Sequence, residues 1–273
     1  MSLGSFTIVK NESTWIAAHI LRVLPFIDEM VFMDGNSTDG TLEIIKAIIL
    51  DHDHGWKITL IENQDPKDLQ DDYVRVFNYA IRSLSTDLAW FLHPDMYVTN
   101  PEQILLVKDS PATALSTSMR SFGGEPNGQL YEIVGRGQEW KNIYRNKNPD
   151  LGLHYAGWYG SAEEDCYFKA ITGFKHEVYD DMTKYPYAVA KSGIEALHYS
   201  DVRPLARRVN RMVSCLLNNA WPVDAARERA RSHPRVTFVE DKQFRFIKSE
   251  YPQEFVEARN KYRHLEKELS LAK

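Results

Sequence analysis

The stretch Met30–Thr41 constrains the possible folds of this chain more than any other part of its sequence. An apolar run ends there in Asp34 and breaks into glycines and small polar residues before a helical pattern begins. The glycines allow the tight backbone that such a turn needs, and Ser37 or Asp39 can cap the following helix. We therefore expect a buried parallel strand whose carboxyl end carries Asp34 into a crevice, which is where open α/β sheets bind ligands.

Short apolar runs alternate with helical patterns over the first third of the chain. This alternation is typical of βαβ units, and it predicts an α/β fold with a Rossmann-like, mostly parallel sheet flanked by helices. Residues Met1–Ser5 look like vector-derived sequence and take no part in this expectation. The predicted strands are Phe6–Val9, Ile27–Met33, Trp56–Ile61, Leu88–Leu92 and, further on, Thr113–Met119, and the predicted helices lie near Thr14–Leu24, Thr41–Leu50 and Tyr73–Leu84.

The net charge, the cysteines and the length of the apolar runs limit the class of protein. With a formal net charge of −5, the chain lacks the basic surplus of a nucleic-acid-binding protein. Its two cysteines, Cys166 and Cys215, have no metal-type spacing, and no apolar run approaches the ~20 residues of a membrane span. We therefore expect a cytoplasmic protein with free thiols, no nucleic-acid partner and no transmembrane segment, and we leave its oligomeric state open.

A second apolar run, within Asp87–Leu92, also ends abruptly in polar side chains. It leads into His93 and Asp95, which repeats the arrangement that ends in Asp34. Together with Ile8–Glu12 upstream, these segments resemble the family 2 glycosyltransferases of the GT-A fold, in the nucleotide-diphospho-sugar transferase superfamily.

This resemblance implies a donor site at the carboxyl ends of the first strands. Family 2 enzymes transfer a sugar with inversion from a nucleotide-diphosphate donor, most commonly a UDP-sugar, to a carbohydrate or other hydroxyl acceptor. Asp34 matches the position that recognises the base or ribose, and Arg75 matches one that steadies this carboxylate or approaches a phosphate. The residues implied in nucleotide-sugar binding are Val9, Asn11, Glu12, Asp34, Asn36, Arg75, His93 and Asp95.

The same resemblance implies a divalent metal, Mn²⁺ or Mg²⁺, that bridges the two phosphates of the donor. In the family's Asp-x-Asp motif the last Asp binds this metal, and Asp95 stands in that place. The first position is His93 here, and an imidazole is a poorer ligand than a carboxylate for hard cations. Many enzymes of this fold supply a late histidine, which corresponds to His198, so the implied metal ligands are Asp95, His198 and His93.

Two other functions stay open beside a metal-assisted transferase. The substitution at His93 motivates the first, a non-catalytic or metal-independent relative that binds a nucleotide or carbohydrate in the same crevice. The second is a nucleotidylyltransferase on a related sheet. Against it, Lys10–Glu12 stands after the first strand, where that class has a glycine-rich loop with Arg and Lys.

Direct displacement at an anomeric carbon needs a carboxylate near the acceptor hydroxyl to take its proton. Two segments compete for this role. Ala162–Lys169 resembles the Glu-Asp motif of family members, which makes Asp165 the first candidate, with Glu164 in support. The pair His176–Glu177 resembles the acceptor-side His-Glu pair of another subset, which makes Glu177 the rival.

The resemblance fades after residue 200. We therefore expect a GT-A core over residues 1–200 and a helical extension over 201–273, with a charged last helix at Phe255–Leu271. Arg203, Arg207 and Arg211 recur at helical spacing opposite an apolar face. Such a stripe either neutralises a leaving diphosphate or is a solvated helix face, and the spacing by itself favours the solvated face.

Overall fold

The structure, a computed structural model, describes residues 1–62, 79–112, 114–134, 138–145, 153–155, 170–172, 189–205, 208–209, 212–213, 222–238 and 245–267. The strands are β1 (Leu3–Val9), β2 (Glu29–Asp34), β3 (Ile58–Glu62), β4 (Leu88–Phe91), β5 (Met96–Val98), β6 (Ala114–Gly124), β7 (Leu130–Val134), β8 (Gln138–Arg145), β9 (Leu153–Tyr155), β10 (Ala170–Thr172), β11 (Val189–Val202) and β12 (Arg245–Ser249). The helices are α1 (Ser13–Val23), α2 (Thr41–Asp51), α4 (Gln103–Val107), α6 (Val223–Ser232), α7 (Pro234–Thr237) and α8 (Gln253–Tyr262), with 3-10 turns η1 (Gly55–Lys57) and η3 (Arg263–Leu265).

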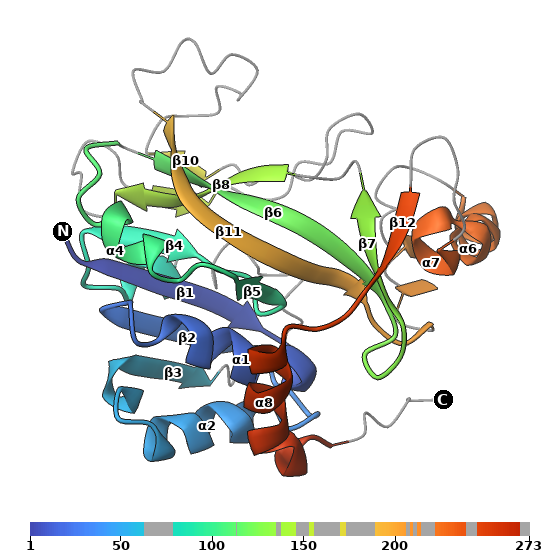
Figure 1. The fold of residues 1–273 in the computed structure, drawn as a ribbon, viewed down its shortest axis with the longest axis horizontal. Coiled ribbons are helices and arrows are strands. Elements are labelled where there is room, and N and C mark those ends of the chain that lie inside the picture. Colours follow the sequence, from blue (N-terminus) through green and yellow to red (C-terminus); the bar gives the residue numbers. More distant parts are fainter. Residues whose placement is uncertain are drawn as a thin grey trace.

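One large mixed sheet organises this part of the chain (Figure 1). Its strands lie in the order β12-β7-β6-β8-β4-β1-β2-β3, and β11 pairs with both β6 and β5. The strands β4, β1, β2 and β3 are all parallel neighbours, whereas β8 joins this parallel half to β6 through antiparallel pairing. The strands β9 and β10 form a separate small sheet.

The parallel half is buried on both of its faces. Along β2, Met30 and Phe32 pack with residues of α1, α2 and α4, while Val31 and Met33 pack on the other face. The helical residues 79–82 contribute to that other face. Burial on both faces requires near-continuous apolar runs, and this is why the runs before Asp34 and His93 lack a two-residue alternation. The expected α/β class with a sheet flanked by helices is confirmed.

The first strand begins earlier than we predicted. Leu3 is fully buried and pairs with Leu88, and its backbone N–H donates a hydrogen bond of 2.8 Å to Asp28 Oδ2. The expectation that Met1–Ser5 take no part in the fold is therefore wrong. The expectation that the third strand begins at Trp56 is also wrong, because Trp56 lies in η1 with 76% of its surface exposed and β3 begins only at Ile58.

Antiparallel pairing between β5 and β11 carries a distant segment to the end of β4. In this pairing His198 lies opposite Met96, directly after the turn that contains Asp95. The long strand β11 also runs parallel to β6 over most of its length. The register of β11 therefore decides which of its side chains reaches the carboxyl edge of the parallel half.

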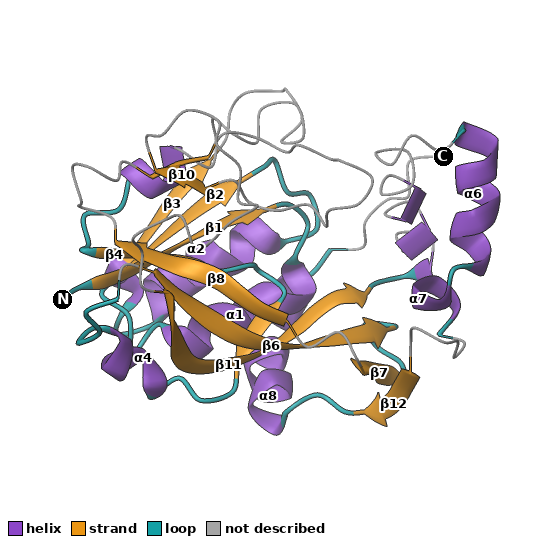
Figure 2. Ribbon diagram, turned by 90° about the horizontal axis from the view of Figure 1, so that it is seen from above, coloured by secondary structure: helices purple, strands orange, loops and turns teal. Residues whose placement is uncertain are grey.

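The segment after residue 200 contributes more than helices. Its strand β12 pairs antiparallel with β7 at one end of the large sheet, and α6 and α7 lie beyond that end (Figure 2). The helix α8 packs on α1, where Phe255 contacts Trp15, and it ends at Tyr262. No helix among the described residues is long and apolar enough to cross a membrane.

Candidate functional site

Asp34 is the last residue of β2 and lies beside the end of β1. Val9 and Asp34 are partners in the parallel register, and the Gly35 N–H donates to the Val9 carbonyl at 2.8 Å. Asp34 is only 2% exposed, and its Oδ2 accepts a hydrogen bond of 3.0 Å from the Ser37 N–H. Its Oδ1 receives no hydrogen bond from the residues that the structure describes. Burial raises the pKa of this carboxyl, although hydrogen bonds from Ser37 oppose the shift.

Two asparagines shape the adjoining loops. Asn11 and Asn36 have left-handed backbones, with φ of 60° and 61°, a conformation that asparagine tolerates better than most residues. The Asn11 N–H donates to Ser37 Oγ at 2.9 Å, and its Oδ1 accepts from the Thr38 N–H at 2.8 Å. The loops after β1 and β2 are thus joined into one surface, on which Asn36 is exposed.

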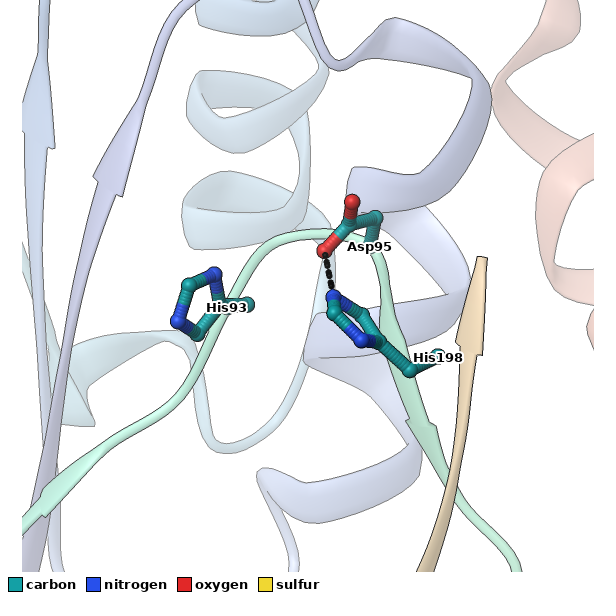
Figure 3. Close-up of side chains that lie close together, drawn as sticks. All are labelled: His93, Asp95 and His198. Atoms are coloured by element: carbon teal, nitrogen blue, oxygen red, sulfur yellow. Dashed lines mark ion pairs between the residues drawn. The ribbon is translucent and has the colours of Figure 1, made fainter. Parts of the chain in front are cut away.

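Three side chains that can bind a metal meet after β4. His93 and Asp95 lie in the turn between β4 and β5, and His198 comes from β11. One ligand atom of each lies within 4.8 Å of the others. Asp95 and His198 point toward each other, with His93 beside them (Figure 3), and His198 Nε2 is 3.3 Å from Asp95 Oδ1. The structure therefore brings together the three metal ligands implied by the sequence.

A fourth side chain, Arg203, forms an ion pair with the other oxygen of Asp95. Its Nη2 lies 3.1 Å from Asp95 Oδ2 and 3.0 Å from Glu12 Oε1, and its side chain is 13% exposed. The prediction of a solvated face is therefore wrong for this residue, while Arg207 and Arg211 lie outside the described residues. Arg203 directly follows the end of β11, and His93 and Asp95 lie within four residues of the end of β4. A position just after a strand is therefore the sequence signal for Arg203, and its helical spacing obscures that signal.

The local charges keep Asp95 ionised. Burial opposes its ionisation, but the nearby His198 and Arg203 outweigh burial and hold the pKa of Asp95 well below its usual range. Burial likewise disfavours the charge on Arg203, yet Glu12 and Asp95 raise the pKa of its guanidinium above the usual value. A permanently charged arginine and an ionised carboxylate therefore stand side by side at this site.

This donor set fits a divalent transition metal. Asp95 Oδ1 is buried and accepts no hydrogen bond from the described residues, so it keeps a lone pair for a cation. Two imidazoles and one carboxylate suit Mn²⁺, Fe²⁺, Co²⁺ or Zn²⁺ better than Mg²⁺, which prefers an all-oxygen shell. The cluster of His93, Asp95 and His198 can hold such an ion while leaving positions for ligands from a substrate.

The remaining site predictions fall on parts of the chain that are not described. Arg75 and the three candidate base residues, Glu164, Asp165 and Glu177, lie outside the described residues. Their roles stay predictions.

Comparison with known proteins identifies the family to which this chain belongs. The glycosyl transferase family 2 profile matches residues 6–160, more than half of the chain. No curated protein matches.

Solved structures give more distant similarities. S. aureus TarS 1–349 in complex with UDP is 16% identical over 54% of this chain and 47% of that chain, with a TM-score of 0.39. Glucosyl-3-phosphoglycerate synthase from Mycobacterium tuberculosis, in complex with Mn²⁺, UDP and phosphoglyceric acid, is 15% identical over 43% of each chain, with a TM-score of 0.33. The mannosyltransferase PcManGT from Pyrobaculum calidifontis, in complex with GDP-Man and Mn²⁺, is 12% identical over 86% of this chain and 73% of that chain, with a TM-score of 0.45. The match thus spans about half the length of the TarS chain. On its profile match, the chain belongs to glycosyl transferase family 2.

Proposed function

We propose that this protein transfers a sugar from a nucleotide-diphosphate donor, a UDP-sugar, to an acceptor hydroxyl with inversion and with the help of a divalent metal. The observation that carries the proposal is the cluster of His93, Asp95 and His198 at the carboxyl edge of the parallel strands. In a family 2 chain this edge is where a nucleotide-sugar donor is expected.

Asp34 is the proposed contact for the nucleoside. Its buried Oδ1 lacks a donor among the described residues, and leaving such an atom unsatisfied is costly. An N–H of a uracil ring or a ribose O–H would supply the missing hydrogen bond. The Asn11 contacts with the loop after β2 keep this carboxylate and its surroundings in place before a ligand arrives.

The metal would be held by Asp95 Oδ1 and by the imidazoles of His93 and His198. When bound, it would stabilise the negative charge that develops on the departing nucleotide diphosphate. Residues of the chain orient the ligand atoms. Arg203 holds Asp95 Oδ2 in place, and the pairing of β5 with β11 sets His198 opposite Met96, next to the turn that contains Asp95. Mn²⁺ suits these donors better than Mg²⁺ does.

The acceptor side needs a general base. A carboxylate must take the proton of the attacking hydroxyl, and Asp165, supported by Glu164, is the first candidate. Glu177 is the rival. Both assignments rest on the family resemblance.

Calorimetric titration with UDP and with GDP, each with Mn²⁺ and with a chelator, tests the donor site. We expect UDP to bind more tightly than GDP and only weakly in chelator. Asp34→Asn should weaken UDP binding about tenfold through the lost hydrogen-bond acceptor, and Asp95→Asn should remove the effect of Mn²⁺. The matched control is Asp53→Asn, because Asp53 is an exposed carboxylate outside the site.

Other results would redirect the assignment. Wild-type binding that is unchanged by chelator would support the metal-independent or non-catalytic alternative. Tighter binding of GDP than of UDP would indicate that the donor carries guanine and not uracil. Inversion is tested separately, by the anomeric proton coupling in the NMR spectrum of the transfer product.

A further inference from the structure

Arg203 joins two carboxylates that come from different strand ends. Its Nη1 and Nη2 donate to the Glu12 carboxylate at 3.2 and 3.0 Å, and Nη2 also donates to Asp95 Oδ2 at 3.1 Å. The side chains of Glu12 and Asp95 are 11% and 6% exposed. The three groups therefore form a largely buried chain of charges beside the proposed metal ligands.

The backbone of Arg203 is fixed by the neighbouring sheet. Its N–H donates to the Gly124 carbonyl at 3.1 Å, and its own carbonyl accepts from Arg208 Nη1 at 2.9 Å. Arg208 is itself buried, with its guanidinium 4.8 Å from the centre of the Phe238 ring. Anchored in this way, Arg203 is built into the site and does not behave as a free surface side chain.

We propose that Arg203 is a built-in counter-cation, which positions Asp95 and competes with a free divalent cation for it, so that metal binds well only together with a nucleotide diphosphate. This inference rests on the proposed metal site. Cation affinity increases with the number of negative charges among the ligands. Arg203 offsets the charge of Asp95, and an imidazole that binds a metal adds no negative charge, whereas a diphosphate brings the missing negative charge.

The proposal predicts strong coupling between Mn²⁺ and UDP in the wild-type protein. Each should tighten the binding of the other by the same factor, since such coupling is reciprocal. Removing the charge of Arg203 should raise the affinity for Mn²⁺ alone by about tenfold, because Asp95 Oδ2 is released. The coupling factor should fall correspondingly.

The choice of variants guards against misfolding. Arg203→Met alone leaves two buried carboxylates without their cation, which is strongly destabilising. The double variant Arg203→Met with Glu12→Gln keeps the net charge of the site and is the main test. Arg203→Lys keeps the positive charge but loses the two-pronged contact with Glu12. Because the proposed effect is one of charge, the coupling in this variant should stay closer to the wild type than the coupling in the double variant. Arg259→Met is the matched control, because Arg259 is 11% exposed and pairs with Glu266 outside the site.

The measurement is an electron paramagnetic resonance titration of free Mn²⁺, with and without UDP, on proteins whose folding is checked by circular dichroism. Tighter Mn²⁺ binding without UDP in the double variant than in Arg203→Lys, together with unchanged binding in Arg259→Met, would support the proposal. Equal or weaker binding in the double variant would overturn it. Tight binding of Mn²⁺ alone by the wild type would also overturn it while leaving the metal site intact. Failure of the wild type to bind Mn²⁺ even with UDP would overturn the metal site and this inference together.

Discussion

The side chain of Asp39 accepts a hydrogen bond of 3.0 Å from the backbone N–H of Ser13, at the start of α1. Its other oxygen accepts from the Thr41 N–H and hydroxyl at the start of α2. One carboxylate thus satisfies donors at the amino ends of two helices, where a negative charge is also favoured by the helix dipoles. Asp39 is 3% exposed, so these donors have no easy access to water.

Asp39→Ala should destabilise the protein by about 2–3 kcal/mol, because it leaves several buried donors without a partner. Urea unfolding measures this loss. Asp53→Ala removes an exposed carboxylate and should change the free energy of unfolding by less than about 0.5 kcal/mol. A similar small change in Asp39→Ala would show that water or another group replaces the carboxylate.

The raised pKa of Asp34 predicts a pH-dependent donor affinity. Burial favours its protonated form, whereas a ligand N–H or O–H that donates to Oδ1 favours the ionised form. Binding therefore releases a proton at low pH, and UDP affinity should rise as the pH rises through the raised pKa and then level off. Asp34→Asn should bind more weakly and lose this rise. Calorimetry across the acid range measures both, and an identical pH profile in the variant would exclude Asp34 as the titrating group.

The strand ends of the parallel half were predictable from the sequence. A strand that is buried on both faces needs an uninterrupted apolar run, so the first polar residue after it marks the ligand edge. Asp34 and His93 are the first polar residues after two such runs, and Asp95 follows His93 by two residues. Asp39 is also one of the two residues that the sequence predicts as helix caps, and it accepts the Thr41 N–H.

Other parts depended on long-range pairing that no local pattern reveals. Nothing in the sequence near β12 indicates that it pairs with β7, because its side chains are mostly exposed. The role of Arg203 was hidden for a different reason. Its spacing with Arg207 and Arg211 is that of a helix face, and only the end of β11 at Val202 places its side chain beside Asp95.

His93→Asp should change the metal preference of the site. An added carboxylate supplies the oxygen ligand and the negative charge that Mg²⁺ prefers, so Mg²⁺ affinity in the presence of UDP should increase on the order of tenfold. Competition of Mg²⁺ against Mn²⁺ in the resonance titration measures this preference. The control is His264→Asp, which alters an exposed histidine. An unchanged preference in His93→Asp would remove His93 from the ligand set.

A buried histidine should make the protein sensitive to acid. His19 lies 3.2 Å from the Met96 carbonyl through Nδ1, and burial lowers its pKa to about 4. Below pH ~6.5 His19 becomes protonated in the unfolded chain but stays neutral in the folded protein. The free energy of unfolding therefore falls by about 3 kcal/mol as the pH drops toward 4. His19→Gln should lose this component. Unfolding in urea at pH 7 and pH 4.5 measures the difference, and an equal loss in both proteins would contradict it.

Two variants separate the candidate bases. If Asp165 takes the proton of the acceptor, Asp165→Asn should lower turnover by about 10²–10⁴-fold, the usual range for loss of a general base. UDP affinity should stay unchanged, because the base acts on the acceptor and not on the donor. Transfer, or donor hydrolysis without an acceptor, measures turnover, and calorimetry measures the affinity.

Glu177→Gln provides the matched comparison, because it removes the same kind of charge from the rival position. It should leave turnover within a few-fold of wild type. A large loss in Glu177→Gln with little change in Asp165→Asn would exchange the two roles and place the protein with the His-Glu subset. Loss of UDP affinity in Asp165→Asn would instead show that this carboxylate supports the donor site, because a residue that contacts only the acceptor should not affect nucleotide binding.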